Sequence, residues 1–260
     1  ENAIIGDIMN KNVISINTMT DQEEAARMCQ KYDFTAMPVV DNEGRMVGII
    51  TIDDVIDILQ EEATEDIEKM AAILPSDKPY FKTGIFETFK NRIPWLLFLM
   101  ISATFTGAII THYESALSAY VVLTAYIPML MDTSGNAGSQ ASVSVIRGLS
   151  LGEIEFAELP KALWKEFRVA ILCGLTLAAA NFVKLILIDH LSLAVAAVIC
   201  ITLVLVVLFA KAIGCTLPML AQRLHFDPAV MASPLITTIV DAVALIVYFA
   251  IATRALNLSL

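Results

Sequence analysis

Long apolar segments after residue 92 constrain the fold more than any other feature of the chain. They lie at about 93–113, 117–147, 167–188, 191–221 and 229–253. Each is near or above the ~20 residues that a helix needs to cross ~30 Å of hydrocarbon. Only helices and closed barrels satisfy their backbone polar groups inside a bilayer. The sequence therefore predicts an α-helical polytopic membrane domain with five transmembrane helices.

The part of the chain before these segments has the pattern of a small α/β unit. Strand-like runs at 13–16, 34–40 and 46–51 are combined with expected helices at 20–32 and about 53–72. We therefore divide the chain into a small cytoplasmic regulatory domain at 1–58, an acidic connecting helix and linker at 59–85, and the membrane domain at 86–260.

Charge is distributed very unevenly between these parts. Residues 1–80 hold 17 Asp and Glu against 6 Lys and Arg, a net of −11, whereas residues 81–260 hold 10 against 11, a net of +1. Nucleic-acid binding requires basic patches, which this sequence lacks, so no nucleic-acid partner is expected. An acidic domain joined to a nearly neutral membrane domain indicates cations as partners.

The expected helix at about 53–72 concentrates this acidity. Asp54, Asp57, Glu61, Glu65 and Glu68 are spaced three or four residues apart, which places them on one face. Like charges at this spacing repel each other, at a cost of a few tenths of a kcal/mol per pair. Solubility alone does not explain a run of acidic residues with no Lys between them.

Lys and Arg gather on one side of the predicted spans. Basic residues flank the first span and occupy the links at 148–166 and 222–228, while the opposite links at 114–116 and 189–190 have none. The positive-inside rule then places the N-terminus in the cytoplasm and the C-terminus outside, in an integral plasma membrane protein surrounded by lipid. Lys184 and Lys211 are expected to extend to the interface.

Two polar stripes inside the predicted spans are candidates for the ion path. Asp241 lies in the middle of the last span, where an Asp costs about 2.5–3.5 kcal/mol, and Thr237 lies one turn before it. Asp132, Asn136 and Gln140 recur every four residues in the second span. The alternatives are a structural Asp241 bonded to a neighbouring helix and, for the second span, a packing interface of small residues.

The same residues resemble the MgtE Mg²⁺ channels. The membrane match rests on Pro128, the run 135–140 (GNAGSQ), 227–229 (DPA), Pro234, Thr238 and Asp241. The preceding unit is similar to a CBS domain in Pro38-Val39-Val40, Gly44, Val47-Gly48 and 51–54 (TIDD). The resemblance covers essentially the whole chain, and the CBS-like unit corresponds to the second of a pair in the family.

The resemblance implies a homodimer with a pore on its two-fold axis, lined by the second and fifth helices. Asp241 would hold a partly hydrated Mg²⁺, with the carbonyl of Thr237 and the polar groups of Asp132, Asn136 and Gln140 nearby. It also implies regulatory Mg²⁺ sites and, as a second cofactor, ATP at the CBS unit near Thr51 and Asp53. The implied regulatory ligands are Asp21, Asp33, Asp54, Asp57, Glu62, Glu65 and Asp66.

These observations predict a Mg²⁺-selective channel that cytoplasmic Mg²⁺ closes. The alternatives are a proton-coupled transporter of divalent cations and a membrane-anchored sensor, and Mn²⁺ or Co²⁺ could replace Mg²⁺. No catalytic motif is present, so we expect no enzyme. Because the chain begins at Glu1 without Met and with one CBS-like unit, we expect a longer natural protein, more strongly inhibited by Mg²⁺ than this chain.

Overall fold

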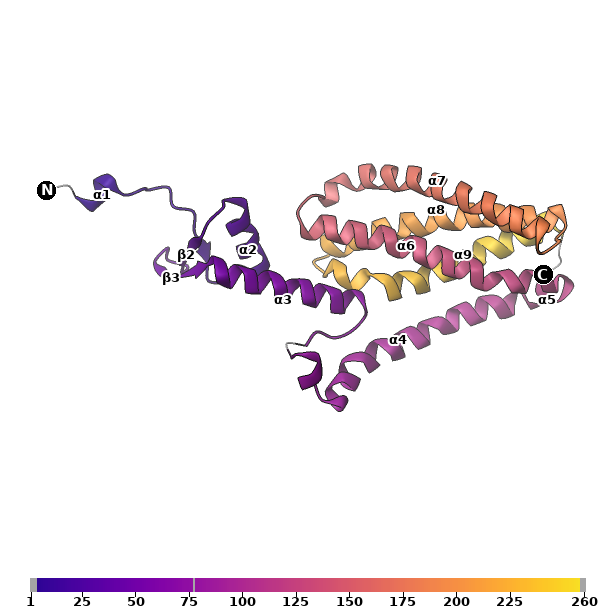
Figure 1. The fold of residues 1–260 in the computed structure, drawn as a ribbon, viewed down its shortest axis with the longest axis horizontal. Coiled ribbons are helices and arrows are strands. Elements are labelled where there is room, and N and C mark those ends of the chain that lie inside the picture. The colour runs from indigo at the N-terminus through magenta and orange to yellow at the C-terminus, as the bar shows by residue number, and fades with distance from the viewer. Residues whose placement is uncertain (1–3, 77, 258–260) are drawn as a thin grey trace. The chain divides into compact units, whose positions relative to one another are not determined.

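The computed structural model describes residues 4–76 and 78–257, and the chain divides into two compact units, Glu1–Asp66 and Ile67–Leu260 (Figure 1). The first unit contains α1 (Ile5–Ile8), β1 (Ile16–Asn17), α2 (Gln22–Lys31), β2 (Ala36–Val40), β3 (Met46–Thr51) and most of α3 (Ile52–Met70). Its sheet has the order β1-β2-β3, with β1 parallel to β2 and β2 antiparallel to β3. The predicted small α/β domain is confirmed.

The core of the first unit is small. Met37 of β2, Val55 of α3 and Cys29 of α2 are almost completely buried, and Ile16 and Ala26 complete the cluster. These side chains come from one face of the sheet and from the two helices that cover it. The packing therefore fixes where the acidic helix α3 begins, directly after β3.

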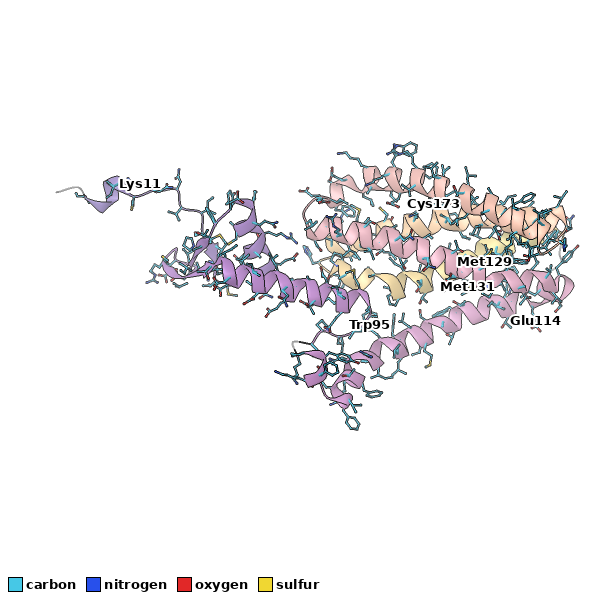
Figure 2. The ribbon with its side chains drawn as sticks, viewed as in Figure 1. Lys11, Trp95, Glu114, Met129, Met131 and Cys173 are labelled. Carbon is cyan, nitrogen blue, oxygen red and sulfur yellow. The ribbon has the colours of Figure 1, made fainter. Side chains whose placement is uncertain are left out.

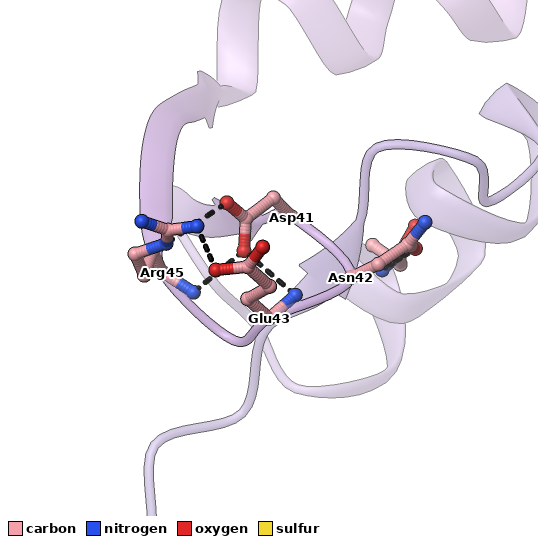
Figure 3. Close-up of polar contacts among 5 residues, drawn as sticks. Asp41, Asn42, Glu43 and Arg45 are labelled. Atoms are coloured by element: carbon pink, nitrogen blue, oxygen red, sulfur yellow. Dashed lines mark hydrogen bonds and ion pairs between the residues drawn. The ribbon is translucent and has the colours of Figure 1, made fainter.

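The hairpin between β2 and β3 is closed by its own side chains (Figure 3). Asp41 Oδ1 accepts hydrogen bonds from the backbone N–H groups of Glu43 and Arg45, both at 2.9 Å. Gly44 has a φ of +75°, a left-handed conformation that glycine adopts without strain. Arg45 in turn forms ion pairs with Asp41 and Glu43. This turn joins the strands that correspond to the predicted runs at 34–40 and 46–51.

The second unit is helical. It contains η1 (Tyr80–Lys82), α4 (Ile85–His112), α5 (Glu114–Ala119), η2 (Val121–Tyr126), α6 (Ile127–Ser150), η3 (Phe156–Glu158), α7 (Leu159–Leu187), α8 (Leu193–Arg223), η4 (Pro228–Met231) and α9 (Ser233–Ala255). Within the described residues, four stretches are long and apolar enough to cross a membrane: Ile85–His112, Phe156–Leu187, Leu193–Arg223 and Pro228–Ala255. Helix α6 is the fifth long helix of this unit, but its polar stripe lowers its mean hydropathy below that of the other four.

The second predicted span, 117–147, is wrong as a single helix. The chain leaves α5 at Ala119, passes through η2, and starts α6 at Ile127. Pro128 occupies the first turn of α6, where its missing N–H leaves no hydrogen bond unmade. The hydroxyl of Tyr248 donates to the carbonyl of Leu123 at 3.0 Å and so holds η2 against α9.

Helix α8 is the centre of the membrane unit and packs against α6, α7 and α9. Glycines allow the closest approaches. A methyl group at Gly174 of α7 would lie 3.2 Å from the Cα of Val204, and one at Gly214 of α8 would lie 2.2 Å from the carbonyl oxygen of Gly138. Helices α6 and α8 therefore meet backbone to backbone.

Helix α4 differs from the others because none of its described residues is buried. It contacts α9 along one side, and Trp95, near its start in Figure 2, lines a shallow apolar cavity with Met231 and Leu235. Its other face exposes large apolar side chains such as Met100, Ile101 and Phe105. That face is suited to lipid or to a second protein surface.

Candidate ion-conduction site

Asp241 lies near the middle of α9 and faces the glycine-rich part of α6. Its side chain is half-buried. A methyl group at Gly135 of α6 would lie 3.1 Å from Thr237 Cγ2 and 3.9 Å from Asp241 Oδ1. The glycine therefore allows α9 to approach α6 closely here, because a larger residue would have to displace the Thr237 side chain.

Among the residues that the structure describes, the carboxylate of Asp241 has no protein partner. Among the described residues, none donates a hydrogen bond to it, and no Lys, Arg or His forms an ion pair with it. A carboxylate inside a membrane domain is costly unless something compensates its charge. The alternative that Asp241 is a structural residue bonded to a neighbouring helix therefore has no support in these contacts.

The threonines before Asp241 donate their hydroxyl protons to the backbone of their own helix. The hydroxyls of Thr237 and Thr238 both donate to the carbonyl of Pro234, at 3.0 Å. A hydroxyl that gives its proton to the backbone presents its lone pairs to its surroundings, where a cation can use them. The carbonyl of Thr237 lies inside the continuous helix α9, so it can offer an ion only its second lone pair.

The predicted stripe of α6 lines a cavity of about 540 Å³. Asp132, Asn136 and Gln140 are all exposed and form one wall of it together with Thr133. The opposite side comes from α7, including Cys173 (labelled in Figure 2) and Thr176, and from α8. Carboxylate and carboxamide oxygens at every turn are the ligands that hard divalent cations prefer.

Asp132 connects this cavity with Asp241. Its carboxylate is close enough to that of Asp241 for the two negative charges to interact. Gly135 and Asp132 are three residues apart, so they lie on adjoining parts of the α6 surface. The structure therefore brings Asp241 and Thr237 together at Gly135, and it brings Asp132, Asn136 and Gln140 together at the neighbouring cavity.

Comparison with known proteins decides what kind of protein carries this arrangement. A sequence profile of the MgtE family, described as divalent cation transporter, matches residues 127–251, and a CBS domain profile matches residues 5–61. The magnesium transporter MgtE of Thermus thermophilus is 40% identical over 253 residues, which cover 97% of this chain and 56% of that protein. The chain belongs to the MgtE family.

Other relatives agree with this assignment. The magnesium transporter MgtE of Bacillus subtilis is 37% identical over 97% of this chain and 55% of its own length. The first unit also resembles the chloroplast CBS domain-containing protein CBSX2 of Arabidopsis thaliana, 34% identical over 53 residues. The chain thus spans little more than half the length of the MgtE relatives. Family membership and the apolar helices make it an integral membrane protein.

The carboxylates that the MgtE resemblance assigns to regulation are dispersed in the single chain. Among the described residues, no group of three or more His, Cys, Asp and Glu side chains is arranged to hold a metal ion. Asp21 is the N-cap of α2 and accepts a hydrogen bond from the Glu23 N–H at 2.9 Å. Glu62 accepts one from the Gln22 amide at 2.7 Å.

Asp54 and Thr51 are bonded to each other at the start of α3. The backbone N–H and hydroxyl of Thr51 donate to Asp54 Oδ2, at 3.0 and 2.7 Å. These two hydrogen bonds hold the pKa of the Asp54 carboxyl below its usual range. Asp54 therefore closes the first turn of α3 as a charged group at neutral pH, and both it and Asp53 are exposed.

The last turn of α3 is attached to the segment that precedes α9. Lys69 Nζ lies 2.6 Å from Asp227 Oδ2, while Asp227 Oδ1 accepts the N–H of Ala229 at 2.8 Å. Asp227 therefore caps η4. Met70 packs beside Ala229 and Ala232. A movement of the end of α3 would act directly on the start of the helix that carries Asp241.

Lys184 has a function that sequence reasoning missed. It and the Tyr126 hydroxyl both donate to Asp189 Oδ2, at 2.8 and 2.7 Å. The bond from Lys184, followed by that from Tyr126, holds the pKa of the Asp189 carboxyl below its usual range. The cation on the predicted outer side is thus paired locally, and it ties the end of α7 to the entry of α6. The presence of an Asp five residues after Lys184 is the sequence feature that could have indicated this ion pair.

This pairing should stabilise the protein at neutral pH and be lost in acid. Because folding lowers the pKa of Asp189 below its unfolded value of about 3.9, the contribution is complete above that value and disappears as the pH falls through the folded pKa. The difference in melting temperature between wild type and Asp189→Asn should be constant from about pH 7 to about pH 5 and shrink below about pH 4. A difference that does not change with pH would contradict this assignment.

Lys211 does not extend to the interface as predicted. Its side chain is 6% exposed and lies 3.5 Å from Glu166 of α7, whose side chain is 13% exposed. The physical reason is that α7 begins at Leu159 rather than at 167, which places Glu166 on a helix inside the bundle instead of in a link.

Proposed function

We propose that this chain forms the pore and the adjoining regulatory unit of a Mg²⁺-selective channel for divalent cation uptake. The observation that carries the proposal is the half-buried carboxylate of Asp241, which has no partner among the described residues and faces α6 at Gly135. A charge of this kind inside a membrane domain is compensated most simply by the ion that passes. The relatives named as magnesium transporters support Mg²⁺ as that ion.

A homodimer would complete the site. One chain supplies two interacting carboxylates, Asp241 and Asp132, and its described residues contain no three-ligand metal group. Mg²⁺ dehydrates reluctantly and usually keeps several waters, so it needs few protein ligands. Two copies of Asp241 across a two-fold axis could hold a hydrated ion through its waters and still release it. The same chemistry would admit Mn²⁺ or Co²⁺.

Regulation would come from the acidic helix α3. At low Mg²⁺ its carboxylates repel one another, and at high Mg²⁺ bound ions bridge them across the dimer and bring the helices together. The contact of Lys69 with Asp227 would transmit this change to the start of α9. We place the N-terminus in the cytoplasm, where these carboxylates would sense the cellular Mg²⁺ concentration, and the C-terminus outside. ATP near Thr51 and Asp53 would be a second ligand of the CBS unit.

Neutralising the acidic helix should weaken this inhibition. We expect Asp57→Asn combined with Glu62→Gln to raise the Mg²⁺ concentration that halves the uptake, because each substitution removes charge that bound Mg²⁺ would compensate. The matched control is Glu43→Gln in the exposed hairpin turn, which should leave the inhibition curve in place. An inhibition curve that is the same in wild type and the double variant would exclude α3 as the sensor.

The membrane voltage at which net Mg²⁺ movement reverses separates a channel from the proton-coupled alternative. The purified protein would be placed in liposomes containing a Mg²⁺-sensitive dye, and the membrane voltage would be set externally. A channel stops net Mg²⁺ movement at the Mg²⁺ equilibrium potential, whatever the proton gradient. A reversal potential that moves with the proton gradient would replace the channel by an exchanger.

A further inference from the structure

Lys211, which is buried, and Glu166, which is largely buried, form an ion pair beside the polar face of α6. Lys211 belongs to α8 and Glu166 to α7, and both lie within segments that are long and apolar enough to cross a membrane. Their side chains are 6% and 13% exposed and 3.5 Å apart. Burying either charge alone would be strongly unfavourable, so each one depends on the other.

Each member of the pair lines a cavity beside α6. Lys211 lines the cavity of about 540 Å³ that contains Asp132, Asn136 and Gln140. Glu166 lines a second cavity of about 210 Å³ with Ser144, one turn further along α6 than Gln140. The polar face of α6 therefore continues past the pair, and Lys211 is one of the residues that border the part of it with oxygen ligands.

An ammonium group in this position would oppose a divalent cation. The cavity contains one carboxylate without a protein cation as partner, that of Asp132, while Lys211 is the cationic side chain among its lining residues. In the low dielectric of a membrane domain, an uncompensated positive charge on the wall would repel a doubly charged ion strongly. Because Glu166 Oε2 lies 3.5 Å from Lys211 Nζ, the pair carries no net charge. The carboxylate of Asp132 then makes the net charge of the cavity negative.

We propose that Glu166 is a positioning residue for conduction, which holds and neutralises Lys211 so that the polar cavity of α6 admits a divalent cation. This inference rests on the proposed function. It differs from a purely structural role of the pair in joining α7 to α8, because a structural role predicts loss of folding, whereas a charge effect predicts loss of Mg²⁺ uptake in a folded protein.

The test compares Mg²⁺ uptake into liposomes by wild type, Glu166→Gln, and the double variant Glu166→Gln with Lys211→Met. Glu166→Gln leaves the Lys211 charge uncompensated and should lower the uptake rate on the order of tenfold at equal amounts of monodisperse protein. The double variant removes both charges and should regain most of the wild-type rate. Making the interior of the liposomes more negative should also restore part of the uptake by the single variant. A packing defect would not show this voltage dependence.

The outcomes are distinguishable. Uptake by Glu166→Gln that equals wild type overturns the inference, and so does a double variant that folds but remains as slow as the single variant. If Glu166→Gln does not fold, the double variant decides: a double variant that folds and conducts supports the charge effect, and one that does not fold makes the pair structural. A wild type without divalent cation uptake overturns the proposed function and this inference together.

Discussion

Replacing Asp241 with alanine should lower Mg²⁺ uptake at least about tenfold, with the protein still folded. Attraction between unit charges 4 Å apart is worth about 4 kcal/mol at an effective dielectric constant of about 20, and ~1.4 kcal/mol already corresponds to a factor of ten. The half-buried carboxylate has no protein cation within the described residues to share this attraction. Asp241→Asn, which keeps the shape, should lose nearly as much.

Asp132→Asn is the matched control for this prediction. Asp132 is exposed on the neighbouring part of α6 and adds its negative charge to that of Asp241. Unlike Asp241, it does not lie between α6 and α9 at Gly135. We expect a smaller reduction than for Asp241→Asn. Dye-loaded liposomes with equal amounts of folded protein would measure all three variants. Unchanged uptake in Asp241→Ala would make Asp241 structural and would move the ion path to Asp132 and Asn136.

Replacing Gly214 with alanine should separate α6 from α8 and destabilise the whole membrane unit. The added methyl group would lie 2.2 Å from the carbonyl oxygen of Gly138, 3.0 Å from its carbonyl carbon and 3.2 Å from Ala141 Cβ. Two of these atoms belong to the backbone, which cannot rotate away as a side chain would. Overpacking of this kind costs about 1–3 kcal/mol and occasionally more, and we expect the upper end.

The matched control is Gly107→Ala in α4. It is the same chemical change in another apolar helix, but a methyl group there would have nothing within 4 Å. Because alanine is about 1 kcal/mol better than glycine in a helix, this variant should be as stable as wild type or slightly more stable. Thermal aggregation in detergent, followed by size-exclusion chromatography, would compare the two. A Gly214→Ala variant as stable as Gly107→Ala would contradict the close approach of α6 and α8.

Features with a strong local signal were predictable from the sequence. The apolar helices α8 and α9 and the acidic helix α3 follow from periodicity and length alone, and the hairpin turn follows from its glycine and Asp41. Asp241 is conspicuous because an isolated carboxylate inside a long apolar run is rare. In each case the physical cause acts within a few residues of the feature.

The features that the sequence did not reveal depend on distant partners. The break before α6 is held by Tyr248 of α9, whose hydroxyl bonds the Leu123 carbonyl. Lys211 looked suited to the interface, but Glu166, 45 residues away, keeps it buried. Gly135 and Gly138 looked alike, yet one faces Asp241 and the other faces Ile236 and the backbone of Ala210. Such pairings arise only when the helices pack.

The position of a bound divalent cation would show whether Asp241 lies on the ion path. Crystals of the chain grown with Mn²⁺, whose anomalous scattering distinguishes it from water, would locate the ion. We expect a peak beside the carboxylate of Asp241, near Thr237 and Gly135, and we expect it to disappear in Asp241→Ala. Peaks on the acidic face of α3 alone, with none between α6 and α9, would contradict this expectation.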